Sequence, residues 1–252
     1  MITTLIYDGT FEGLLTAAFE VYERRLVYVS LKKGELRNEA LFTEVISIIT
    51  DDGKAQRVLR GLKMKLSPIG VQRLYAAHLA EIDGEDNTLL GYIRYVFDAG
   101  QNIEEDYGNK YVMRVSEIVR MVRREKHRME AFIRFRKLRD ETFYAGIEPD
   151  FNVLPLLIEH FKSRYADQKW IIYDLRRRYG VYYDLHDTQY ISLEHADVKA
   201  ANVISAYTSD ENLYQDMWKN YFKSVNIPAR KNSKLHLMHV PKRYWRHLTE
   251  KI

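Results

Sequence analysis

The pattern of apolar and polar positions divides the chain into a helix-rich first half and a second half in which strands are frequent. Short apolar runs at 2–7 and 26–31 flank residues 11–25, whose apolar positions recur at helical spacing. Further helices are predicted at 51–64, 68–81, 86–99 and 108–130. The first half is therefore expected to be a strand, a helix and a strand followed by several helices.

After residue 130 the period of the pattern changes. Residues 131–138 alternate between apolar and polar, and 142–147 follow across a polar turn, which predicts a hairpin. Beyond it the pattern predicts a helix at 153–165, strands at 170–174 and 181–185, and helices at 197–207 and 211–222. The fold class predicted is α/β (α+β), with a mainly helical portion at 1–130 and an antiparallel sheet carrying helices at 131–252, as two domains or one compact domain.

Composition narrows the class of protein. With 252 residues and 46% hydrophobic residues the chain can bury a core, so disorder is a poor interpretation. It contains no apolar run near the roughly 20 residues that span a bilayer and no signal-peptide pattern at its start, which predicts a cytoplasmic protein without membrane contact. Without cysteine it has no disulfide, thiolate nucleophile or cysteine-ligated cluster. No cofactor is expected, and any redox or radical chemistry would belong to a partner.

Charge is unevenly distributed along the chain. Residues 110–140 contain 11 lysines and arginines against 4 acidic residues, a net charge of +7, and residues 219–252 contain 9 against 1, a net charge of +8. Because the whole chain carries only +4, the remainder is acidic. Two basic blocks on an acidic body are the electrostatic pattern expected of a phosphate-binding surface. Either block alone is equally well explained as a solvated charged face.

The helix predicted at 108–130 carries cations toward its C-terminal half. Cations there offset the partial negative charge of the unpaired carbonyls, but this effect accounts for only part of the cluster. The residues are Arg120, Arg123, Arg124, His127 and Arg128. We expect this group to contact phosphates, with Arg123, Arg124 and Arg128 as a clamp. The alternative is a solvated face, or internal pairing with carboxylates such as Glu125 or Asp150.

Aromatic and basic residues alternate in the strand predicted at 131–138, a composition found in proteins that stack bases and follow phosphates along single strands. Core packing is the simpler explanation for Phe132 and Phe135, because a half-buried strand alternates between core and water. Arg134 remains a candidate for base contact. The candidates for nucleic-acid binding in the second basic block are Lys242, Arg243, Tyr244 and Trp245.

Metal-dependent chemistry has weaker support. His236 and His239 have the H-x-x-H spacing, but the H-E-x-x-H arrangement is missing, so no metal site is expected. The carboxylates at predicted strand ends or turns, where catalytic acids gather in nucleases, are Asp8, Asp150, Asp174 and Asp184. Aspartate also favours turns for conformational reasons. Serine hydrolase, P-loop and dinucleotide-binding motifs are missing from the sequence.

Several strings spread over nearly the whole chain resemble those of one family. They are Tyr7-Asp8-Gly9, Phe11-Glu12-Gly13-Leu14-Leu15, His127-Arg128-Met129, Phe132-Ile133-Arg134-Phe135, Ile147-Glu148-Pro149-Asp150, Val153-Leu154-Pro155-Leu156, His160-Phe161, Arg164-Tyr165-Ala166-Asp167-Gln168, Trp170, Ile172-Tyr173-Asp174, Trp218, Tyr221-Phe222 and Pro241-Lys242-Arg243-Tyr244-Trp245. In these strings the chain resembles an uncharacterised bacterial family described as probable DNA metabolism proteins.

The resemblance implies a DNA-repair context. Members of that family are typically encoded beside a radical-SAM putative DNA repair or modification protein, and longer relatives carry a uracil-DNA glycosylase-like domain. This chain resembles the short form without that domain, so glycosylase activity is not expected of it. The family supplies no established catalytic residues.

The function expected from the sequence is a DNA-binding accessory protein in DNA repair or modification, with DNA and the radical-SAM protein as partners. Two alternatives stay open. One is a metal-dependent nuclease or related phosphodiester enzyme, and the other is a protein-binding scaffold without DNA affinity.

Overall fold

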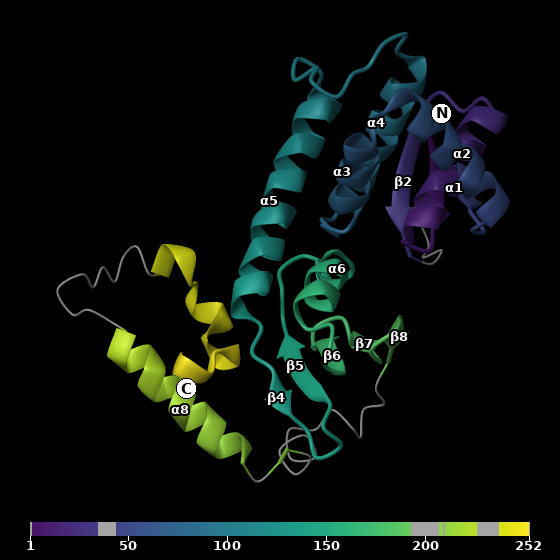
Figure 1. Ribbon diagram of the computed structural model, residues 1–252. Coiled ribbons are helices and arrows are strands. Elements are labelled where there is room, and N and C mark those ends of the chain that lie inside the picture. Colours follow the sequence, from purple (N-terminus) through teal and green to yellow (C-terminus); the bar gives the residue numbers. More distant parts are fainter. Residues whose placement is uncertain (1, 35–43, 193–206, 209, 226–236, 252) are drawn as a thin grey trace. The chain divides into compact units, whose positions relative to one another are not determined.

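The computed structural model describes residues 2–34, 44–192, 207–208, 210–225 and 237–251, and the chain divides into two compact units (Figure 1). Unit 1 comprises Met1–Arg123 and unit 2 comprises Arg124–Ile252. The boundary falls inside one long helix, α5 (Lys110–Phe132), seven residues before the boundary expected at 130.

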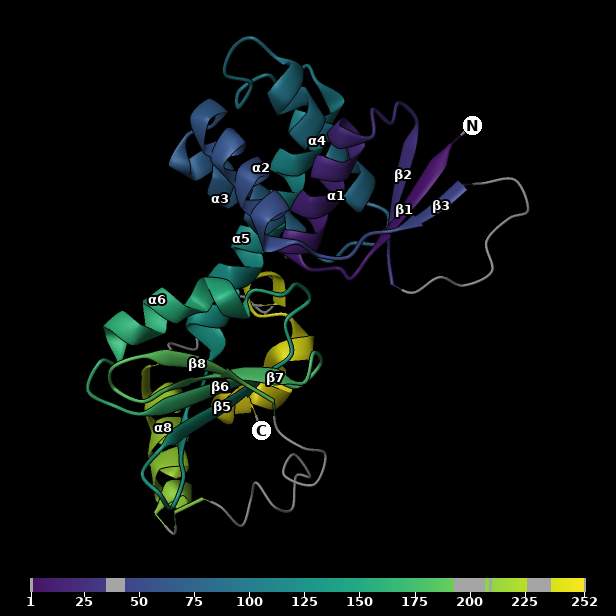
Figure 2. The ribbon, with the colours of Figure 1, turned by 90° about the vertical axis from the view of Figure 1, so that its right-hand side faces the viewer.

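Unit 1 is built on a three-stranded parallel sheet with the order β2-β1-β3. Its strands are β1 (Thr3–Tyr7), β2 (Val29–Lys33) and β3 (Glu44–Ser47), and its helices before α5 are α1 (Phe11–Glu23), α2 (Asp52–Lys65), α3 (Pro68–His78) and α4 (Asp86–Asp98). Every residue of β1 is buried, because neighbours pair with it on both edges: Leu5 lies opposite Leu31 of β2 and Ile46 of β3. Figure 2 shows the strands side by side with the helices gathered beside them.

The helices of unit 1 begin where the sequence supplies caps. The side chains of Thr10, Asp51 and Ser67 each accept a hydrogen bond from a backbone N–H in the first turn of α1, α2 and α3. The predicted helices are therefore present with small shifts of their ends. The strand predicted at 26–31 lies instead at Val29–Lys33, and β3 was not predicted, since its sequence is short and half exposed.

Unit 2 contains a five-stranded sheet with the order β4-β5-β6-β7-β8. The strands are β4 (Arg136–Lys137), β5 (Phe143–Ile147), β6 (Trp170–Asp174), β7 (Tyr179–Tyr183) and β8 (Thr188–Ile191). The helices are α6 (Leu154–Arg164), α8 (Glu211–Val225) and two short 3-10 helices, η2 (Lys242–His247) and η3 (Thr249–Lys251). Helix α6 covers one face of this sheet (Figure 2). Its residues Leu157 and Phe161 are buried.

The mixed α/β class is confirmed, but the sheet of unit 2 is mixed rather than antiparallel. Strands β5 and β6 are parallel because α6 carries the chain back across the sheet between them, while the other three pairings are antiparallel. The strand predicted at 131–138 is also shorter than expected. Helix α5 continues to Phe132, which leaves only Arg136 and Lys137 to pair with β5 as the predicted hairpin.

Two further predictions concern residues that lie mostly outside the described ranges. The helix predicted at 197–207 and His236 fall outside the described residues, apart from Tyr207, which forms an isolated bridge with Leu138. In the described part of the chain, no helix combines the length and the apolar character needed to cross a membrane.

Candidate functional site

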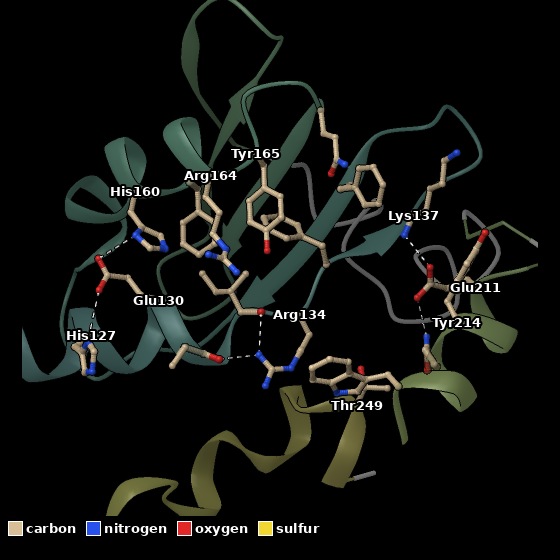
Figure 3. Close-up of a pocket in the computed structure, with 18 residues that line it drawn as sticks. His127, Glu130, Arg134, Lys137, His160, Arg164, Tyr165, Glu211, Tyr214 and Thr249 are labelled. Atoms are coloured by element: carbon tan, nitrogen blue, oxygen red, sulfur yellow. Dashed lines mark hydrogen bonds and ion pairs between the residues drawn. The ribbon is translucent and has the colours of Figure 1, made fainter. Parts of the chain in front are cut away.

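A pocket of about 970 Å³ lies within unit 2. Its walls come from the C-terminal turn of α5, the segment that leads into β4 and β5, helix α6, helix α8 and Thr249 (Figure 3). This volume is at the upper end of the range of about 300–1,000 Å³ typical of sites for small molecules. Of the residues predicted to bind nucleic acid, the fold brings His127 and Arg134 into this pocket.

Arg134 is held in place on one side of the pocket. Its guanidinium donates to the carbonyl of Ala131 at 2.7 Å and to both carboxylate oxygens of Glu250, at 2.8 and 3.3 Å. It also lies over the ring of Trp218, 5.4 Å from the centroid, and the Trp218 Nε1 donates to Glu250 at 2.8 Å. Burial raises the pKa of the Glu250 carboxyl, but the hydrogen bonds from Arg134 and Trp218 outweigh it and leave the pKa below its usual value.

Two imidazoles flank one carboxylate at the opposite side of the pocket. The Nδ1 atoms of His160 and His127 lie 3.8 and 3.7 Å from the two oxygens of Glu130, which also binds Lys126 (Figure 3). His127 is 86% exposed, whereas His160 is more enclosed. The two imidazoles and the carboxylate therefore form a polar group on this side of the pocket.

Helix α6 contributes a cation and an aromatic ring beside His160. Arg164 follows His160 by one helical turn, is exposed, and lies over the ring of Tyr165 at 5.8 Å. No carboxylate of the described residues pairs with Arg164. Tyr165 in turn stacks on Phe161 and meets the edge of Phe135, with ring centroids 6.0 and 5.3 Å apart.

Helix α8 adds exposed aromatic surface and polar groups. Trp218 and Tyr214 both line the pocket and are 39% and 59% exposed. Gln215 also lines it and donates to Glu211, which accepts from the backbone N–H of Lys137. The pocket thus combines aromatic rings, side-chain amides and the guanidinium of Arg164, which has no carboxylate partner among the described residues.

The remaining cations predicted on α5 divide into two groups. Arg120, Arg123 and Arg124 are exposed and have no ion-pair partner among the described residues. Their spacing places them with His127 on one face of the helix. Arg128, the third member of the predicted clamp, is instead mostly buried and lies 3.6 Å from Glu125.

Glu125 is the centre of a buried cluster in unit 2. Its carboxylate is almost fully buried and accepts from the Tyr244 hydroxyl at 2.5 Å and from the backbone N–H of Asp150 at 2.9 Å. Arg243 lies 3.8 Å from Glu125 and 2.6 Å from the Asp150 carboxylate. Burial, followed by the hydrogen bond to Glu125, raises the pKa of Tyr244. Tyr244 is 2% exposed, so its ring offers no surface to a base.

The rest of η2 is also engaged with the protein. Arg246 and His247 both pair with Glu148, His247 through Nε2 at 2.9 Å. Burial lowers the pKa of His247 although Glu148 opposes the shift. Trp245 donates to the carbonyl of Val240. Lys242 is exposed and lies 6.0 Å from the Trp245 ring.

The four aspartates considered for metal-dependent chemistry are each bound to other residues of the protein. Asp8 accepts from Thr10 and Thr50, Asp174 from Arg177, and Asp184 from the backbone of its own turn, while Asp150 pairs with Arg243. Within the residues that the structure describes, no three histidines, aspartates or glutamates converge as a metal site.

The pocket residues that the sequence left unassigned include Glu130, His160, Arg164, Tyr165, Tyr214 and Trp218. One signal was available, since His160 and Arg164 stand one turn apart in a predicted helix next to an aromatic residue. Nothing in the sequence indicated that α6, α8 and the end of α5 would meet.

Comparison with known proteins gives two findings and one negative result. A family model described as a domain of unknown function, DUF4130, matches residues 83–250. A solved structure, the pGpG-specific phosphodiesterase PggH from Vibrio cholerae, is similar at 13% identity over 81% of this chain and 97% of that chain, with a TM-score of 0.34. A score of this size does not establish a shared fold. No curated protein matches the chain.

Proposed function

We propose that this chain, which belongs to the DUF4130 family of domains of unknown function, is a nucleic-acid-binding protein that acts as an accessory in DNA repair or modification. The observation that carries the proposal is the pocket of unit 2. There exposed aromatic rings line one concave surface together with an arginine that has no carboxylate partner in the described part of the chain. Stacking rings beside cations are what proteins use to hold unpaired nucleotides and their phosphates.

The exposed arginines of α5 support the same function. A cation that is not paired with a carboxylate can neutralise a phosphate and release its counterions without first breaking an internal ion pair. Arg124 lies one turn before His127, which lines the pocket, so cationic side chains continue from the pocket along the helix. In this proposal the protein contacts phosphates without reading sequence, since the sequence contains no recognisable motif of a base-reading helix.

The chemistry of repair or modification belongs, in this proposal, to a radical-SAM partner. The family resemblance supports this division, and so does the composition, because a chain without cysteine cannot supply thiolate ligands to an iron–sulfur cluster. Mixing the two purified proteins and measuring complex formation by size exclusion, with and without DNA, tests this part of the proposal. A radical-SAM protein that stays separate in both conditions contradicts it.

DNA binding is tested by fluorescence anisotropy with labelled single-stranded and double-stranded oligonucleotides at two salt concentrations. We expect binding to both, with weak sequence preference and a strong loss of affinity on going from about 50 to 200 mM salt. No binding at low salt overturns the proposal and favours a protein-binding scaffold. Cleavage of the oligonucleotides on addition of Mg²⁺ or Mn²⁺ favours the nuclease instead.

A further inference from the structure

The pocket of unit 2 has the dimensions of a site for one small molecule rather than for a double helix. A duplex presents paired bases that are already stacked, and its width exceeds what a concave site of about 970 Å³ can enclose. A single nucleotide that has left the stack does fit a site of this size. The distinction matters because exposed arginines alone would bind any DNA.

Rings from two helices meet this requirement for an unpaired base. Tyr165, the residue that caps the C-terminal end of α6, is already supported from behind by Phe161, to which it lies nearly parallel at an interplanar angle of 7°. Trp218 of α8 is fixed by its hydrogen bond to Glu250 and by Arg134 over its ring, and still exposes 39% of its surface. Rings that are held in place lose little conformational entropy when a base stacks on them.

The cation suited to the phosphate is Arg164, not Arg134. The guanidinium of Arg134 is occupied by Glu250 and by a backbone carbonyl, so it acts as a positioning residue for Trp218. Arg164 has no carboxylate partner in the described part of the chain and lies beside Tyr165, one turn after His160. Its planar guanidinium can bind two phosphate oxygens at once, and His160, beside Glu130, can donate a further hydrogen bond.

Side-chain amides complete the site. Gln168 and Gln215 both line the pocket, and an amide can donate to and accept from the polar edge of a base. Such groups convert a stacking surface into one that distinguishes a nucleotide from another flat molecule.

From these contacts we infer that the pocket of unit 2 binds one unpaired nucleotide of a DNA strand, with its base against Tyr165 and Trp218 and its phosphate on Arg164 and His160. This inference rests on the proposed function and adds the substrate class: DNA that contains an extrahelical or single-stranded nucleotide.

The test compares three labelled oligonucleotides of equal length. The first is a fully paired duplex, and the second is a duplex with one unpaired nucleotide. The third is identical to the second except that an abasic analogue replaces the unpaired nucleotide. The wild-type protein should prefer the unpaired nucleotide over the other two by about tenfold, which is the size expected from stacking one base. Trp218→Leu and Arg164→Ala should each remove most of this preference. Trp218→Leu should act through the base, so it should leave affinity for the abasic duplex almost unchanged.

Matched controls lie outside the pocket. Tyr190→Leu removes an aromatic ring that is 62% exposed on β8, and Arg60→Ala removes an exposed arginine of α2. Both should keep the preference for the unpaired nucleotide. Thermal unfolding checks each variant, and if Trp218→Leu does not fold, Arg164→Ala at an exposed position still decides the matter.

The possible results distinguish a failure of the inference from a failure of the proposed function. Equal, salt-dependent binding of all three DNAs, or a preference that survives in both folded pocket variants, overturns the inference and leaves DNA binding by α5 intact. Failure to bind any of the three overturns both.

Discussion

The two basic regions of this protein are similar in charge but differ in what their cations contact. On helix α5, Arg120, Arg123 and Arg124 are exposed and unpaired within the described residues. In η2, Arg243 pairs with Asp150 and approaches Glu125, and Arg246 pairs with Glu148. These three cations of α5 therefore have no carboxylate partner in the described part of the chain, whereas Arg243 and Arg246 of η2 are engaged by carboxylates of unit 2.

The difference teaches that a net charge counted along the sequence does not measure the charge that a phosphate encounters. A cation already paired with a carboxylate contributes little net field, and binding it to DNA would leave that carboxylate without its partner. The acidic residues that neutralise η2 are Glu125, Glu148 and Asp150, about a hundred positions earlier in the chain. No local count could have included them.

The largest effect that would test this comparison is expected at Glu125. Changing Glu125→Ala should lower the free energy of unfolding by about 3 kcal/mol, because it leaves the buried Tyr244 hydroxyl and the backbone N–H of Asp150 without an acceptor. Urea unfolding followed by circular dichroism measures it. The control is Glu117→Ala, whose half-exposed pair with Arg114 should be worth less than about 1 kcal/mol. Equal stability of the two variants would mean that the cluster around Glu125 is not structural.

The next effect concerns DNA affinity. Replacing Arg120, Arg123 and Arg124 together by Ala should weaken binding roughly tenfold or more and reduce the salt slope by up to about 0.9 for each lost phosphate contact. Folding should be almost unchanged, within about 0.5 kcal/mol, since the side chains are exposed.

The control for that variant removes the same charge from the second region. Lys242, Arg243 and Arg246 changed together to Ala should lower stability but leave the salt slope close to that of the wild type. If both triple variants weaken binding equally, net charge rather than its location determines affinity, and the comparison fails.

A smaller effect is expected from acid at the pocket. The folded pKa of Glu250 lies below its usual value, so the unfolded chain takes up this proton first as pH falls. The stability that Glu250 contributes is therefore complete above about pH 4.3, the ordinary value, and is lost as pH falls through the folded pKa. The free energy of unfolding should be measured from pH 7 to pH 3 for the wild type and for Glu250→Gln. The difference between the two values should become smaller over this acidic range. A difference that stays constant down to pH 3 contradicts the assignment.

The smallest effect is predicted at Lys242, which is exposed. Among the described residues, its side chain approaches only the Trp245 ring, at 6.0 Å. Lys242→Ala should change stability by less than about 0.5 kcal/mol and DNA affinity by less than about twofold. Anisotropy titrations of wild type and variant side by side measure it. A severalfold loss of affinity would return the C-terminal basic region to the DNA-binding surface.

The sequence predicted most elements whose residues carry their own local signals. Thr10, Asp51 and Ser67 are caps that mark helix starts directly, and the buried run Trp170–Asp174 was predicted with its observed ends. Strands without such signals were missed: β3 and β8 are short and largely exposed. The parallel pairing of β5 with β6 was missed because strand direction depends on the path of α6, not on the composition of either strand.

The candidate site was less predictable than the fold. Arg134 and His127, which were predicted by type and position to bind nucleic acid, line the pocket, but His160, Arg164 and Trp218 from other helices also line it. Their proximity follows from the packing of α5, α6 and α8 around the sheet, which no spacing in the sequence encodes. Tyr244 illustrates the opposite error, since an aromatic residue in a basic string was read as a base contact but is buried against Glu125.

Unit 2 contains contacts between residues that are far apart in the sequence, and this separation determines when they can form during synthesis. Arg134 lies 116 residues before its partner Glu250, and Glu125 lies 119 residues before Tyr244. The strands of unit 1 are all synthesised by Ser47, so that sheet can form while translation continues. The contacts of Glu125 and Arg134 in unit 2 can form only after Tyr244 and Glu250 have been synthesised, so unit 2 is completed later than the sheet of unit 1.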